Sequence, residues 1–375
     1  MKFQVNKDVL SEAVSFAVRI LPLKNKQQIL SGILIEADAN AIRFSVFDYE
    51  VSARVEVVAK VEESGRILVS SKFLSDISSR LPNAPVEFEA DGSKLLLTCG
   101  SSKFTLPLMD VEAYPTLPEL PETNGTISGD TFSDAVSQVA MAASRDETPA
   151  WMTGVLIETS PTQVAFTATD RYRVALKEID WQSSSTEDLS ALVPAKTLQE
   201  IAKTFANQTE ISIGIKVVEE RGMIAFKANN RSVTTQLIKE QARPVRNYFP
   251  QASEDYAIVS IQDLIDSTRR VALVLDKQPA LKYAFTDGEV KLEANESAQA
   301  SESIGAELTG NSVTVMLKPQ YLIDALGACH SEFVKISFTN SENPNKPGPV
   351  LITGHGAKDK ADSFKYLLQP NLLRG

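Results

Sequence analysis

Two stretches of this chain, 122 residues apart, have nearly the same pattern. The segment SGILIEADANAIRFSVFDYEVSAR (31–54) aligns without a gap on TGVLIETSPTQVAFTATDRYRVAL (153–176). Both contain G-x-L-I-E followed, eight residues after the glutamate, by F-x-x-x-D. Chance seldom aligns so many positions at one fixed offset. The sequence therefore predicts a structural unit that is used more than once.

Apolar residues with the helical spacing i, i+3, i+4, i+7 form six segments, about 62 residues apart on average. The segments between them alternate apolar and polar residues and have Gly or Asn at the expected turns, which is typical of strands. We therefore predict an α+β fold of six strand–helix–strands units, taken two at a time into three similar domains. The first apolar positions of the six helices are Leu10, Leu74, Phe132, Leu198, Leu264 and Leu322.

Two stretches rich in proline or polar residues are the predicted linkers. YPTLPELPET (114–123) has closely spaced prolines, which neither a helix nor a central strand accommodates. YFPQASEDY (248–256) is the second. The predicted domains are residues 1–120, 124–250 and 254–375.

Composition excludes several classes of protein. The 375 residues are 43% hydrophobic and 23% charged, as in soluble globular proteins, and no apolar run approaches the roughly 18 residues of a membrane helix. Cys99 and Cys329 follow no metal or redox spacing, so we predict buried thiols and a cytoplasmic protein. A net charge of −10 argues against indiscriminate nucleic-acid binding, although a local basic surface remains compatible with it.

The sequence lacks an evident catalytic constellation. His330 and His355 are the only histidines, and GxxxxGK[ST], HExxH and GxSxG motifs are absent. Asp48 and Asp170 occupy equivalent repeat positions, which favours a structural turn over acid–base catalysis. We expect no enzyme activity, no cofactor and no metal. From the residues alone, an enzyme or ligand-binding protein with a site in an interdomain cleft stays open as the alternative.

Several motifs together resemble the bacterial β sliding clamps, the β subunit of DNA polymerase III, over the whole chain. These are the MKFQV start, the repeat described above, TDRYRVA, LVPAK and YLLQP. The resemblance implies a head-to-tail homodimeric ring with helices inside and sheets outside, which encircles duplex DNA irrespective of sequence. It also implies a groove between the central and C-terminal domains. That groove would bind peptides of the DNA polymerase III catalytic subunit, the clamp loader, and other polymerases and repair proteins. The implied location is the cytoplasm, at the nucleoid during replication, with no membrane partner.

The resemblance also assigns candidate residues to three surfaces. The peptide groove would comprise Met152, Thr169, Arg171, Tyr172, Arg173, Val174, Asn247, Tyr248, Pro349, Leu367, Leu368 and Gln369. DNA would be contacted by Lys24, Lys72, Arg145, Trp151, Lys196 and Lys203. The dimer interface would contain Lys103, Phe104 and Leu106 on one side and Val274, Leu275 and Glu302 on the other.

Some candidates have a second interpretation. Arg171 and Arg173 could instead form surface salt bridges, and at least one of Leu367 and Leu368 should face the core, since strand neighbours point in opposite directions. Gln369 stands where the family often has methionine, which predicts a more polar subsite in the groove.

Overall fold

The structure is a computed structural model that describes residues 1–21, 27–146, 148–217, 222–250, 253–276, 280–295, 298–339, 347–356 and 363–372. It confirms the predicted α+β fold. Two compact units divide the chain: the first contains residues 1–133 and 181–239, and the second contains residues 134–180 and 240–375.

The six predicted helices are all present, and each follows a strand directly. All six first apolar positions are fully buried, with an exposed fraction of 0%. Side chains cap three of these helices, where Asn6, Ser70 and Ser260 each accept a hydrogen bond from a backbone N–H of the first turn. The helices are α1 (Lys7–Arg19), α2 (Ser71–Ser78), α3 (Gly129–Ala140), α4 (Ala195–Phe205), α5 (Ile261–Val271) and α6 (Pro319–Ala328).

The sequence repeat is a repeat of structure. Its first copy forms the antiparallel strands β2 (Gly32–Asp38), β3 (Ala41–Phe47) and β4 (Val51–Val58). Its second copy forms β11 (Gly154–Thr159), β12 (Gln163–Thr169) and β13 (Arg173–Asp180). The register is conserved too, because Ile35 lies opposite Phe44 and Ile157 lies opposite Phe166.

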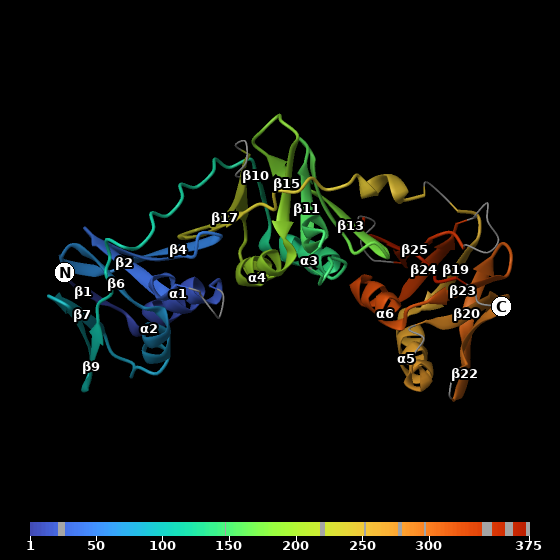
Figure 1. The fold of residues 1–375 in the computed structure, drawn as a ribbon, viewed down its shortest axis with the longest axis horizontal. Helices are drawn as coiled ribbons and strands as arrows, with labels where there is room; N and C mark the ends of the chain where they lie inside the picture. The colour runs from blue at the N-terminus through green and yellow to red at the C-terminus, as the bar shows by residue number, and fades with distance from the viewer. Residues whose placement is uncertain are drawn as a thin grey trace. The chain divides into compact units, whose positions relative to one another are not determined.

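The first unit contains two antiparallel sheets, coloured mainly blue to green in Figure 1. Helices α1 and α2 lie side by side, α1 against β3 and β4 and α2 against β6. The first sheet has the order β5 (Lys60–Glu63), β1 (Lys2–Val5), β7 (Val86–Asp91), β8 (Lys94–Cys99) and β9 (Ser102–Pro107). The second has the order β14 (Gln182–Ser183), β10 (Gly125–Ile127), β16 (Ile211–Lys216), β17 (Met223–Ala228), β18 (Arg231–Gln236), β4, β3, β2 and β6 (Gly65–Ser70). The chain also forms β15 (Leu189–Pro194), which leads directly into α4.

The second unit contains a long run of paired strands. Helices α5 and α6 contact each other, α5 packs against β21 and β22, and α6 packs against β26. The strand order is β11, β12, β13, β26 (Lys365–Leu368), β25 (Val350–His355), β24 (Phe333–Phe338), β19 (Tyr256–Ser260), β22 (Gln299–Thr309), β21 (Gly288–Asn295), β20 (Leu281–Thr286) and β23 (Val313–Leu317).

The third strand of each repeat pairs with a strand that comes much later in the sequence. In the first unit β4 pairs with β18, so that Val55 lies opposite Arg231. In the second unit β13 pairs with β26, so that Val174 lies opposite Leu367. These long-range pairings explain why the two compact units do not coincide with three consecutive segments of sequence.

Other features agree with expectations from the sequence. Cys99 and Cys329 are both buried free thiols, as predicted. Residues 115–124, most of the predicted first linker, have neither helix nor strand. In the part of the chain that the structure describes, no helix has the length and apolar character needed to span a membrane.

Candidate functional site

The turns that end the two repeats share one backbone conformation. Asp48 Oδ1 accepts hydrogen bonds from the backbone N–H groups two and three residues further on, at 3.0 and 2.7 Å. Asp170 Oδ1 does the same, at 3.1 and 3.2 Å. The next residue has a positive φ in both turns, 75° at Tyr49 and 81° at Arg171. The predicted structural role of the two aspartates is therefore confirmed, and only the side chains at the turn differ between the copies.

The positive φ at Arg171 predicts a stability difference between two substitutions. Arg171→Ala and Arg171→Gly both remove the exposed side chain, but only glycine adopts this φ without a steric penalty. We expect the glycine variant to be more stable than the alanine variant by about 1 kcal/mol in chemical denaturation. Equal stability of the two variants would show that the turn relaxes when the side chain is lost.

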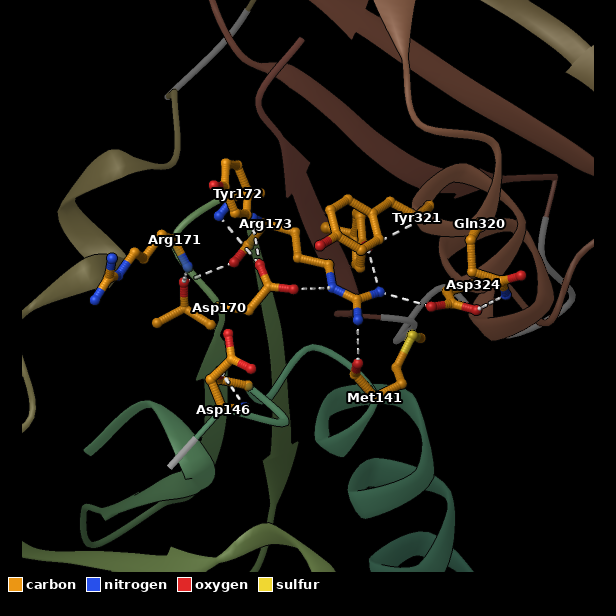
Figure 2. A network of polar contacts seen from close by, with 12 residues as sticks. Met141, Asp146, Asp170, Arg171, Tyr172, Arg173, Gln320, Tyr321 and Asp324 are labelled. Carbon is orange, nitrogen blue, oxygen red and sulfur yellow. Dashed lines mark hydrogen bonds and ion pairs between the residues drawn. The ribbon is translucent and has the colours of Figure 1, made fainter. Parts of the chain in front are cut away.

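Arg173, the first residue of β13, is the centre of a buried polar network (Figure 2). Its side chain is 7% exposed. Its Nε donates to Asp170 Oδ2 at 2.9 Å, and Nη1 donates to Asp324 Oδ2 at 2.6 Å and to the hydroxyl of Tyr366 at 3.2 Å. Its Nη2 donates to the backbone oxygen of Met141 at 2.6 Å. The first repeat has a valine at this position, so the network is particular to the second copy.

This network joins elements that are far apart in sequence. Asp324 lies on α6, Tyr366 lies on β26, and Met141 follows α3. Burial raises the pKa of the Tyr366 hydroxyl above its usual range, although the Arg173 guanidinium opposes the shift. The alternative interpretation of Arg173 as a surface salt bridge is wrong, because its ion pairs are buried.

Two tyrosines and a lysine lie next to this network. The ring centres of Tyr172 and Tyr321 are 6.4 Å apart, and the Arg173 guanidinium lies 4.2 Å from the centre of the Tyr321 ring. Lys318 Nζ lies 4.4 Å from the centre of the Tyr172 ring and 4.8 Å from that of Tyr321. Sequence reasoning missed Lys318, Tyr321 and Asp324. The available signal was the segment VMLKPQYLIDAL, in which Lys318 directly precedes the sixth helix and Tyr321 and Asp324 lie within it.

The structure separates the other predicted groove residues into a buried set and an accessible set. Gln369 is held by two hydrogen bonds: its backbone N–H donates to the Tyr172 carbonyl oxygen at 2.8 Å, and its Nε2 donates to the Pro347 carbonyl oxygen at 3.1 Å. The buried residues are Met152, Thr169, Val174, Leu367 and Leu368. Pro349 and Gln369 are half-buried, and Arg171, Tyr172, Asn247 and Tyr248 are exposed.

The exposed pair Asn247 and Tyr248 lies in the short helix η3 (Val245–Tyr248). Arg246 in this helix forms ion pairs with Glu158 on β11 and Glu178 on β13. The second repeat thus holds η3 in place, while the Tyr248 side chain is 62% exposed.

The predicted DNA contacts have different surroundings. Lys72 on α2 and Lys196 on α4 are exposed. Lys203 on α4 is also exposed, but it forms an ion pair with Glu200 at 2.8 Å. Lys24 lies outside the described residues.

The remaining two DNA candidates differ in exposure. Arg145 is exposed. Trp151 is only 9% exposed, and its backbone N–H donates to Glu240 at 3.1 Å. The indole of Trp151 is therefore part of the core of the second unit, with little surface for a DNA contact.

The first predicted side of the dimer interface lies on β9, an edge strand of its sheet. Phe104 is half-buried, Leu106 is 8% exposed and Lys103 is exposed. An edge strand has unpaired backbone groups that can pair with another chain.

The second predicted side lies at and after η4 (Ala272–Val274). Val274 and Leu275 are half-buried, whereas Leu273, which sequence reasoning missed, is 83% exposed. Glu302 forms an ion pair with Arg270 of the same chain, with Arg270 Nε 3.0 Å from Glu302 Oε2. That intrachain pair occupies the carboxylate that was predicted to face the other subunit.

Family models match the chain in three consecutive parts. They are the N-terminal domain of the DNA polymerase III beta subunit at residues 1–118, its central domain at 126–242 and its C-terminal domain at 246–359. The chain belongs to the DNA polymerase III beta subunit family. Its function is that of a DNA sliding clamp, so it is a processivity factor and not an enzyme.

Individual relatives agree with this assignment. The beta sliding clamp of Streptomyces coelicolor is 40% identical over 382 residues, which cover 100% of both chains. That of Micrococcus luteus is 41% identical over 311 residues, 82% of this chain and 100% of the relative. The solved beta subunit of Streptococcus pyogenes shares the fold, with a TM-score of 0.91 at 24% identity over 100% of both chains.

Proposed function

We propose that the surface around the β12–β13 turn binds short peptides of replication and repair proteins. Tyr172 and Tyr248 are exposed, and buried apolar residues of β13 and β26 lie beneath this surface. Such an arrangement suits a linear peptide with a few apolar anchors. The observation that carries the proposal is the Arg173 network, which fixes the turn before any ligand arrives, and so lowers the ordering cost of binding.

The proposed partners follow from the family function. They are the catalytic subunit of DNA polymerase III, the clamp loader, and other polymerases and repair proteins that carry clamp-binding peptides. The proposed location is the cytoplasm, with the clamp at the nucleoid during replication. The proposed domain boundaries remain residues 1–120, 124–250 and 254–375.

We also propose that two copies close head to tail into a ring around duplex DNA. The apolar residues of β9 would meet residues 273–275 of the next copy, as expected for a heterologous interface that closes. A ring holds DNA topologically, so its contacts with phosphates can be weak. That weakness is compatible with a net charge of −10, provided that lysines such as Lys72 and Lys196 face the DNA.

A retention assay on DNA tests the ring. The chain is loaded onto nicked circular duplex DNA by its clamp loader, and bound protein is counted before and after the circle is cut. A ring should stay on the circle and leave the linear molecule within the same incubation. Equal retention on both forms would contradict topological binding.

The lysines of α4 provide a prediction on the DNA contact itself. The slope of log K against log salt is negative, and the Lys196→Gln variant should make it less steep by up to about 0.9, the contribution of one phosphate contact. Lys203→Gln should change it less, because Glu200 already neutralises part of that charge. Binding of the unloaded chain to a short duplex at low salt gives both slopes. A larger effect at Lys203 would contradict this assignment.

A further inference from the structure

The segment that follows the first sheet extends across the second sheet of the first unit. At its start, the Met109 backbone N–H donates to the Leu68 backbone oxygen on β6 at 2.8 Å. At its end, the Asn124 N–H donates to the Ile213 oxygen on β16 at 2.8 Å. In the sheet order, β2, β3, β4, β18 and β17 lie between β6 and β16. Residues 109–124, here called the strap, therefore cross the pairing of β4 with β18.

One register row of this sheet runs from β3 to β16. Its members are successive cross-strand partners, so their side chains point to the same face of the sheet. All of them are buried. In order along the row they are Phe47, Ser52, Thr234, Ala225 and Gly214. Apart from Phe47 these residues are small, which leaves room for a backbone segment to lie directly on the sheet.

Tyr114 attaches the strap to the β3 end of this row. Its hydroxyl accepts a hydrogen bond from the Phe47 backbone N–H at 2.8 Å and lies 3.4 Å from the Gly32 backbone oxygen. Tyr114 is 4% exposed and packs against Leu34, Phe47 and Leu68. Burial raises the pKa of Tyr114 to about 12, so the hydroxyl stays protonated at neutral pH. The strap is thus anchored by a side chain that is both packed and hydrogen-bonded.

Gly214 receives the strap at the β16 end of the row. A Cβ at this position would lie 2.4 Å from the Glu122 backbone oxygen and 2.9 Å from that of Pro121. Both distances are shorter than a van der Waals contact, so only glycine lets the strap lie this close. Between the two ends, the Arg54 guanidinium on β4 donates to the Pro118 backbone oxygen. The strap is therefore held on both sides of the β4–β18 pairing.

The strand pairing beneath the strap is polar where its counterpart in the second unit is apolar. Ser52 lies opposite Thr234, and their hydroxyl oxygens are 2.7 Å apart. The corresponding pair at the second repeat is Val174 opposite Leu367, and both residues are buried. Two hydroxyl side chains bury less apolar surface than a valine and a leucine do. The contact of β4 with β18 on this face therefore depends more on the segment that covers it.

We infer that the strap is a latch that keeps β4 paired with β18. The family models end the N-terminal region at residue 118 and begin the central region at residue 126, so the strap joins two regions that meet at this pairing. With the strap in place, both regions share one continuous sheet and one compact unit. When Tyr114 leaves β3, the two strands separate while each region keeps its own core. This property belongs to the single chain and is independent of the proposed peptide site and ring.

A thiol placed beneath the strap measures how often the latch opens. Thr234→Cys introduces this thiol at a position that is 2% exposed. Its alkylation by iodoacetamide requires opening, and peptide mapping by mass spectrometry separates it from alkylation of the buried Cys99 and Cys329. Cys99 lies on β8 in the first sheet of the same unit, so its rate reports global unfolding of that unit.

Two substitutions release the strap from opposite ends. Tyr114→Phe keeps the aromatic ring and leaves the buried Phe47 N–H without its acceptor. Gly214→Ala places a methyl group against the Glu122 backbone oxygen and so displaces the other end. The two variants share no contact, so a common effect on the thiol would arise from the strap itself.

Each substitution has a matched control in the second unit. Tyr283→Phe removes a buried hydroxyl that lies 3.2 Å from the Thr268 hydroxyl. Gly327→Ala adds a methyl group on α6, where it meets no atom of the described residues within 4 Å. All variants are made in the Thr234→Cys chain, and circular dichroism verifies that each is folded.

The alkylation rate at position 234 should rise about tenfold in both strap variants, the effect of leaving one buried donor unpaired. The rate at Cys99 should change by less than about twofold, and the controls should leave both rates unchanged. An equal rise at Cys99 would show that the strap contributes only to global stability, and would overturn the latch. An unchanged rate at position 234 would overturn it too. A rise in only one of the two variants would contradict a strap that is held at both ends.

Discussion

Replacement of Arg173 by leucine should destabilise the second unit by about 3–5 kcal/mol. The change leaves two carboxylates, Asp170 and Asp324, without the buried guanidinium that pairs with both. It also removes the donor to the backbone oxygen of Met141. Hydrogen exchange should report the loss in β13, β26 and α6, while the first unit keeps its protection.

Arg246→Leu is the matched control for Arg173→Leu. Arg246 also pairs with two carboxylates of the second unit, but its side chain is 40% exposed. Its removal should cost no more than about 1 kcal/mol, as for other solvated ion pairs. Equal losses of stability in the two variants would contradict the structural role assigned to Arg173. The buried Arg173 network would then stabilise the second unit no more than the exposed ion pairs of Arg246 do. Partial recovery in an Arg173→Leu/Asp324→Leu double variant would support that role further.

Replacement of Leu273 by aspartate should prevent formation of the proposed ring. Leu273 is 83% exposed in the single chain, so an aspartate there costs the fold little. In a closed ring the same position would be covered by the next copy, and a buried carboxylate without a partner costs several kcal/mol. The dissociation constant of the dimer should rise at least about 100-fold, measured by sedimentation.

Val58→Asp controls for the effect of a charge at an exposed apolar position. Val58 is 85% exposed on β4, and no interface is proposed there. This variant should remain dimeric and stay on circular DNA, whereas Leu273→Asp should be monomeric and lost from it. A dimer of unchanged affinity in Leu273→Asp would remove residues 273–275 from the interface.

The fold could be predicted from the sequence because burial determines where its apolar residues stand, both along each helix and in the repeated strands. A helix with one apolar face must place that face in a core, and all six first apolar positions are fully buried. The repeat was visible because the paired strands need the same residue types in the same register, such as Ile opposite Phe. The pairing of β13 with β26 was not predictable in this way, because nothing in a local pattern specifies a partner far along the chain.

The candidate site was only partly accessible to sequence reasoning. The resemblance to the sliding clamps assigned Arg173 and Tyr172 to the site, at the end where the second repeat differs from the first. Lys318 and Tyr321 had no such assignment, and their proximity to Tyr172 depends on tertiary packing. The sequence did not predict the exposure of Leu273 either, since an apolar residue at the end of a helix is most often part of a core.

The pairing of β13 with β26 has a consequence for the order of events during protein synthesis. Strand β13 leaves the ribosome long before residues 365–368, by roughly 10–40 s at ordinary rates of translation. Until then the strand edge beside Arg173 has no neighbour, and the Tyr366 hydroxyl that accepts from Arg173 does not yet exist. A nascent chain therefore lacks the strand that completes the proposed peptide surface until residues 365–368 have been made.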